Sequence, residues 1–152
     1  MSHPPVPPER TADQARRTGT AIIALALTVA VLSTGAALLV GGTIGAIALT
    51  TGITGAGMAV LTGLTLRNAT GSIPNPAPNP ALNPALDPAQ ARTVRRVLVA
   101  LFVAAALCYA GFLVAAFAIG VTAVTFALML LEAIPTILAA VAAVTGHRAL
   151  RA

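Results

Sequence analysis

Two long apolar blocks dominate the pattern of hydrophobic and polar positions along this chain. Residues 18–66 carry no charged side chain, and residues 97–147 carry only one, that of Glu132. A single helix over either block would run about 75 Å, whereas the hydrocarbon core of a bilayer is about 30 Å thick. Each block therefore fits two passes of about 20 residues joined by a tight turn. The pattern predicts an all-α integral membrane protein with four transmembrane helices arranged as two hairpins.

Turn and capping signals divide the chain into segments. We expect an extended, Pro-rich arm over residues 1–10, and a first helix that is capped by Thr11 and runs to Val40. Further helices are expected over about 44–66, 88–119 and 123–145, with turns at 41–43 and 120–122 and with Asp87 as the cap of the third helix. The predicted segments are an N-terminal arm and interfacial cap (1–17), transmembrane hairpin 1 (18–66), a cytoplasmic linker (67–93), transmembrane hairpin 2 (94–146) and a C-terminal tail (147–152).

The linker between the two blocks contains a short tandem repeat. Residues 75–90 hold four copies of an Asx-Pro-Ala-X tetrapeptide. Asx followed by Pro favours a type I turn, so the repeat predicts a compact spacer between the hairpins. The two halves of the chain also share a layout, because one common shift along the sequence places Arg16-Arg17 on Arg95-Arg96 and Gly41 on Gly120. This layout suggests a parallel internal repeat.

All nine basic residues are arginines that lie outside the apolar blocks. Charged residues make up 9% of the chain, against about 25% in a typical soluble domain. The lack of lysine, with abundant Ala, Gly and Pro, is typical of a GC-rich bacterial genome. The positive-inside rule then places both termini and the linker in the cytoplasm, with the chain in the bacterial inner membrane. Too few aromatic residues are present for nucleic-acid binding, so we expect contacts with anionic lipid headgroups, made by Arg16, Arg17, Arg67, Arg92, Arg95, Arg96, Arg148 and Arg151.

Small residues recur every four positions along the second predicted helix. Such faces let helix backbones approach closely, which matters in lipid because the bilayer supplies no hydrophobic drive between helices. The pattern fits helix packing within this chain, and it also fits self-assembly or binding of another membrane protein. The residues of this small-residue stripe are Thr51, Gly55, Ala59 and Gly63 on one face and Gly52 and Ala56 on a neighbouring face.

Glu132 is the one acidic or basic side chain well inside a predicted span. A charge at the bilayer centre costs at least about 2.5 kcal/mol, so we expect Glu132 to point into the bundle, and Pro135 to kink the helix beside it. Its carboxyl either handles a proton or cation, or is neutral and joins helices through a hydrogen bond. The hydroxyls expected near it belong to Tyr109, Thr50, Thr54 and Thr136.

The sequence around Glu132 has one family resemblance. Leu131-Glu132-Ala133-Ile134-Pro135 is similar to the proton-carrying segment of rotary ATPase proteolipid subunits. Four helices with one acid on the last also resemble the duplicated form of those subunits. Two features depart from that family: the small-residue stripe lies on the second helix, and the arginines place the termini on the opposite side of the membrane. The chain is therefore not assigned to it.

The chain offers few residues for catalysis or metal binding. His3 and His147 lie far apart, with no carboxylate or cysteine at ligand spacing, and Cys108 is the only cysteine. We expect no catalytic site, no metal and no cofactor. The first hypothesis is a non-enzymatic accessory, regulatory or effector component, with phage exclusion among its possible roles, that acts through helix packing and cytoplasmic contacts. The alternative is a small proton or cation channel, or a proton-coupled carrier, that uses Glu132.

Overall fold

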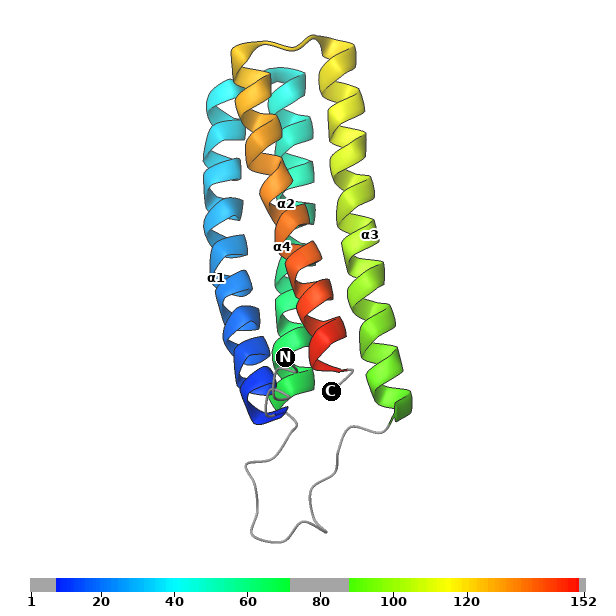
Figure 1. Ribbon diagram of the computed structural model, residues 1–152. Helices are drawn as coiled ribbons and strands as arrows, with labels where there is room; N and C mark the ends of the chain where they lie inside the picture. The colour runs from blue at the N-terminus through cyan, green and yellow to red at the C-terminus, as the bar shows by residue number, and fades with distance from the viewer. Residues whose placement is uncertain (1–7, 72–87, 151–152) are drawn as a thin grey trace, which may run out of the picture.

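A computed structural model describes residues 8–71 and 88–150, and these ranges form four helices. They are α1 (Pro8–Val40), α2 (Gly42–Gly71), α3 (Pro88–Ile119) and α4 (Ala123–Ala149). The helices run side by side, with both turns at one end of the bundle and the start of α1 and the end of α4 at the other (Figure 1). Each helix is long and apolar enough to cross a membrane. The prediction of an all-α chain with four such helices is confirmed.

Four helix ends agree with the prediction: the end of α1, both ends of α3 and the start of α4. α2 begins at Gly42, two residues before the predicted start, and α4 continues to Ala149, beyond the predicted end at residue 145. α1 begins at Pro8, so Thr11 is not its N-cap, and residues 8–10 are helical where an extended arm was expected. Proline suits a first helical turn because the N–H that it lacks would have no partner there. α2 continues beyond Leu66 to Gly71. Asp87 and most of the tetrapeptide repeat lie outside the described residues, so the predicted spacer stays a prediction.

Glycine makes both turns possible. Gly41 has a φ of 63° and Gly120 a φ of 116°, a region that residues with a Cβ rarely adopt. The N–H of Gly41 donates to the carbonyl of Ala37 at 3.0 Å, which satisfies an open acceptor at the end of α1. After the second turn the Thr122 hydroxyl accepts a hydrogen bond from the backbone N–H of Thr125 at 3.2 Å. This bond caps the start of α4.

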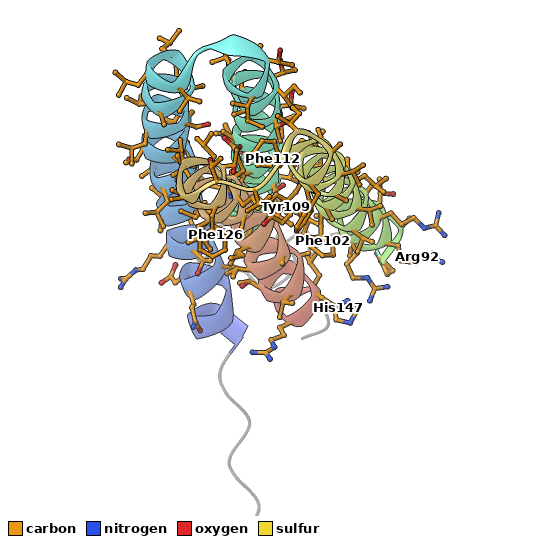
Figure 2. All side chains as sticks on the ribbon, turned by 90° about the horizontal axis from the view of Figure 1, so that it is seen from above. Arg92, Phe102, Tyr109, Phe112, Phe126 and His147 are labelled. Carbon is orange, nitrogen blue, oxygen red and sulfur yellow. The ribbon has the colours of Figure 1, made fainter. Side chains whose placement is uncertain are left out.

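The four helices do not contact one another equally. α2 and α4 each contact all three other helices, whereas α1 and α3 lie at opposite corners of the bundle and do not touch. The view along the bundle in Figure 2 shows α4 between α1 and α3, next to α2. A side chain of α4 that faces inward can therefore reach both α1 and α2.

The bundle interior is rich in small residues, and many large apolar residues are exposed on its outside. Alanines fill much of the interior, among them Ala26, Ala48, Ala59, Ala105, Ala116 and Ala139. Bulky apolar side chains point away from the bundle on all four helices, among them Val31, Leu39, Ile53, Leu107, Val114, Phe117 and Ile137. Exposure of so much apolar surface is unfavourable in water and suits lipid.

Two apolar clusters with a polar layer between them make up the interior. The cluster nearer the turns joins all four helices and consists of Ala37, Ala48, Phe112, Ala116, Leu128 and Met129. The cluster nearer the arginines joins α1, α2 and α4 and consists of Ala15, Ile22, Ala26, Ala59, Leu66, Leu138 and Ala142. Between the two clusters lies one residue from each of these three helices. They are the buried polar residues Ser33 of α1 and Glu132 of α4 and the close-packed Gly52 of α2.

Candidate functional site at Glu132

The side chain of Glu132 lies inside the bundle, as its position on α4 predicts. It is 2% exposed, and Ser33 of α1 is 1% exposed beside it. The Ser33 hydroxyl donates a hydrogen bond to Glu132 Oε1. This bond joins α1 to α4 in the apolar interior, where a hydrogen bond has no competition from water.

A glycine of α2 makes room for this pair. A Cβ at Gly52 would lie 2.8 Å from Glu132 Oε1 and 3.0 Å from the Cβ of Ser33, closer than such atoms pack. The bond between α1 and α4 therefore forms only because α2 has no side chain at this level. The three residues Ser33, Gly52 and Glu132 are called the polar layer below.

Pro135 lies about one turn after Glu132 and packs against another glycine of α2, Gly55, with more space between them. It is buried, and a Cβ at Gly55 would lie 3.4 Å from its Cβ, which is ordinary contact. α4 runs through Pro135 as one helix. Because proline lacks an N–H, the carbonyl of Leu131 loses its usual donor within the helix. The predicted kink at Pro135 stays a prediction.

One oxygen of the carboxyl has no hydrogen bond among the described residues. Glu132 Oε2 is buried without such a partner, while Oε1 is held by Ser33. Leaving a buried polar atom unpaired costs about 1–3 kcal/mol, and burying an unpaired carboxylate costs far more. The geometry therefore suits a neutral carboxyl that keeps one oxygen unused.

Two of the hydroxyls expected near Glu132 join α3 to α4 instead. The Tyr109 hydroxyl donates to the carbonyl of Met129 at 3.1 Å. The Thr136 hydroxyl donates to the carbonyl of Ala105 at 3.4 Å. Both bonds run between these two helices, and neither hydroxyl donates to the carboxyl of Glu132.

The other two expected hydroxyls face outward. Thr50 and Thr54 are exposed, and their hydroxyls donate to carbonyls of their own helix, four residues back, at 3.0 and 2.8 Å. Their expected placement beside Glu132 is therefore wrong. Sequence reasoning missed Ser33 as the partner, although one signal was available, because Ser33 is the only serine in the two apolar blocks.

The small-residue stripe of α2 is used within this chain. Gly63 packs on α1, where an added Cβ would lie 2.9 Å from the carbonyl oxygen of Gly19, and Gly52 and Gly55 pack on α4. The stripe is therefore covered by α1 and α4 and is not an open face. All of its members are buried: Thr51, Gly52, Gly55, Ala56, Ala59 and Gly63.

The described arginines gather at the end of the bundle away from the turns. They lie near the starts of α1 and α3 and near the ends of α2 and α4, which share that end (Figure 1). Arg95 is half-buried. Six further arginines are exposed: Arg16, Arg17, Arg67, Arg92, Arg96 and Arg148. Arg151 lies outside the described residues.

No protein-family model, curated protein or solved structure shows significant similarity to this chain. Within residues 8–71 and 88–150, no group of three or more His, Cys, Asp or Glu side chains has the arrangement of a metal site.

Proposed function

We propose that this chain is a four-pass protein of the bacterial cytoplasmic membrane that works as an accessory, regulatory or effector component. In this proposal the helices form two transmembrane hairpins related as parallel repeats, with both termini and the linker in the cytoplasm. The protein acts by binding other membrane components and not by catalysis. Exclusion of phage is one form that such an effector role could take.

The single observation that carries this proposal is the enclosure of Glu132. The carboxyl is bonded to Ser33 and closed in by Gly52, with apolar clusters on both sides along the bundle. A conduction path needs polar groups or water across the whole apolar thickness of a bilayer. An enclosed carboxyl that joins α1 to α4 instead supports a structural role, which leaves the outer surface for function.

The outer face of α3 is the best candidate for contact with a partner. α3 does not touch α1, and Leu107, Val114 and Phe117 extend outward from it with about 70% of their surface exposed. The small-residue stripe is already covered within the chain, so a partner helix or a second copy would use an outer face such as this one. The arginines at the cytoplasmic end would add polar contacts.

Site-specific photo-crosslinking in native membranes tests this role. A photoreactive side chain at Val114, which is 71% exposed, should yield a discrete protein adduct that mass spectrometry identifies. The matched control is the same group at Val31, a valine on the outside of α1 that is 73% exposed. If protein adducts form equally from Val31 and Val114, or if both positions yield lipid adducts alone, the partner-binding role of the α3 face is contradicted.

A proton or cation channel, or a proton-coupled carrier, is the second candidate. The observation in its favour is Glu132 Oε2, which has no hydrogen bond to any residue that the structure describes and so leaves one carboxyl oxygen available to a proton or ion. Purified protein in liposomes, under an imposed pH or cation gradient, tests this role. A flux that Glu132→Gln abolishes would establish conduction and displace the accessory proposal, whereas a leak equal to that of empty liposomes would remove the channel.

A further inference from the structure

At the arginine end of the bundle, α3 and α4 form a groove of about 430 Å³. Figure 2 shows Arg92 at the start of α3 and His147 near the end of α4 on the same side of the molecule. We call this hollow the α3–α4 groove. The described residues that line it are Arg92, Arg95, Arg96, Val99, Ala100 and His147.

Packing beneath the groove fixes its two walls. Leu98 of α3 is 1% exposed and lies against Gly146 of α4, so closely that a Cβ at Gly146 would overlap its side chain. Leu66 of α2 lies 3.4 Å from the same Cβ position. The starting turns of α3 and the last turn of α4 are therefore held together immediately below the arginines.

The charges of the groove are of one sign. Arg92, Arg95 and Arg96 are spaced by three and four residues, which places them on one helix face, where like charges repel by about 0.2–0.5 kcal/mol per pair. No acidic side chain is among the described residues that line the groove. An anion would relieve this repulsion, and guanidinium groups bind phosphate oxygens through paired hydrogen bonds.

A second groove on α1 gives a useful contrast. It has a volume of about 550 Å³ and includes Arg16 and Arg17, but Asp13 lies among the same lining residues. A carboxylate in the lining competes for the arginines and repels an anionic ligand. We therefore expect the α1 groove to prefer anions less than the α3–α4 groove does, although it is similar in size and also contains arginines.

The α3–α4 groove changes character along the helix. Val99 and Ala100 also line the groove, and both are exposed. They follow the arginines along α3 by about one turn, on the side of the apolar block. One end of the groove is thus cationic and the other is apolar. This polarity matches a lipid, in which a charged headgroup continues into an acyl chain, better than it matches a small soluble anion.

We propose that the α3–α4 groove is a binding site for an anionic phospholipid. The arginines bind the phosphodiester of the headgroup, and the start of an acyl chain lies along Val99 and Ala100. The imidazole of His147 forms the wall on the α4 side. This inference rests on the proposed membrane location and goes beyond it, because it assigns one specific lipid site instead of general contact with headgroups.

Native mass spectrometry of the purified full-length protein tests the site. The protein in mild detergent receives phosphatidylglycerol or phosphatidylcholine with identical acyl chains. We expect phosphatidylglycerol to be retained at least fivefold better. The variant R92Q/R96Q should lower its retention at least fivefold. The comparison variant R16Q/R17Q removes the same charge from the α1 groove that contains Asp13, and it should lower retention by less than twofold.

Several outcomes would overturn the site. Equal losses in the two double variants would mean that charge alone attracts the lipid, and equal retention of both lipids would exclude headgroup recognition. Displacement of phosphatidylglycerol by 10 mM inorganic phosphate would assign the groove to a free anion.

A lysine variant guards against misfolding of the glutamine variant. R92K/R96K keeps the charge but not the paired donors, so its retention of phosphatidylglycerol should fall between that of the native chain and that of R92Q/R96Q. Fractionation of cells tests the membrane location separately, because a failure there would leave the protein in the soluble fraction whatever it binds in detergent.

Discussion

Ser33, Gly52 and Glu132 come from three different helices and meet at one level of the bundle. Ser33 supplies a donor, Glu132 an acceptor, and Gly52 the space that both need. The three residues depend on one another. A larger residue in place of Gly52 would occupy the space of the Ser33–Glu132 hydrogen bond, and without the Glu132 carboxyl the Ser33 hydroxyl would lose its acceptor. The polar layer therefore specifies how α1, α2 and α4 align along their axes.

Removal of the donor should weaken the bundle. Ser33→Ala leaves Glu132 Oε1 as well as Oε2 without a described partner, so we expect a loss of about 1–3 kcal/mol. The control is Thr28→Ala on the same helix, since Thr28 is exposed and bonds only to its own helix at 3.0 Å. The measurement is the temperature at which the half-buried Cys108 becomes reactive to a thiol dye in detergent. Equal shifts for the two variants would remove the structural role of the Ser33–Glu132 bond.

The requirement for space at residue 52 gives a second prediction. Gly52→Ala should lower the apparent Tm by about 3–10 °C, because its methyl group overlaps the polar layer and overpacking costs about 1–3 kcal/mol. Gly57→Ala is the matched control on α2, since nothing lies within 4 Å of its added Cβ. It should leave the Tm unchanged or raise it slightly. A Gly52→Ala variant as stable as Gly57→Ala would contradict the described contact.

At the scale of the helices, α1 and α2 come close together at a pair of glycines, Gly19 and Gly63. A Cβ at Gly19 would lie 2.8 Å from the carbonyl oxygen of Gly63, and a Cβ at Gly63 would lie 2.9 Å from that of Gly19. These are backbone atoms, which cannot rotate out of the way as a side chain can. The close approach lets two apolar helices gain van der Waals contact where lipid gives no hydrophobic drive.

Methyl groups at this crossing should force the two helices apart. We expect Gly63→Ala to destabilise the bundle by about 1–3 kcal/mol, because α1 must shift along its length at the arginine end. Gly35→Ala, at an exposed position of α1 with open space around it, should be neutral. Thermal unfolding followed by circular dichroism at 222 nm compares the two variants. A neutral Gly63→Ala would show that the helices cross elsewhere.

Much of the helical layout follows from the sequence, for physical reasons that particular residues illustrate. The lengths of the two apolar blocks predict the number of helices, and Gly41 and Gly120 mark the turns because only glycine readily takes their positive φ. The predicted start of α1 was wrong because two local signals compete there. Thr11 begins a capping box, whereas Pro8 is tolerated in the first turn of a helix. Local patterns of this kind fix a helix end only to within a few residues.

The candidate site was harder to predict than the helices. The burial of Glu132 follows from the cost of a carboxyl in lipid, but its partner depends on how the helices rotate about their axes. Thr50 and Thr54 lie at suitable depth, yet they point outward, and their hydroxyls bond to their own helix. Helix rotation is set by long-range packing, here by Gly52 and Gly63, which single-helix periodicity does not reveal.

At the scale of the whole molecule, the distribution of side-chain sizes and charges argues for a bilayer. Alanine and glycine take up much of the interior, many leucine and valine side chains are exposed on the outside, and the described arginines lie at one end. Both turns, at the other end, have no charged residue. A protein folded in this way has one end that water and anionic headgroups can solvate well, and that end should stay in the cytoplasm.

Cysteine labelling of right-side-out membrane vesicles tests this orientation most directly. In a Cys108→Ala background, single cysteines replace Thr43 or Val121 at the turns, or Gln14 or Thr93 at the arginine end, all of which are exposed. A membrane-impermeant maleimide should react with the two turn positions in sealed vesicles, and with residues 14 and 93 only after permeabilisation. Reaction at residue 14 or 93 in sealed vesicles, or labelling of one turn without the other, would contradict a four-pass bundle whose arginine end faces the cytoplasm.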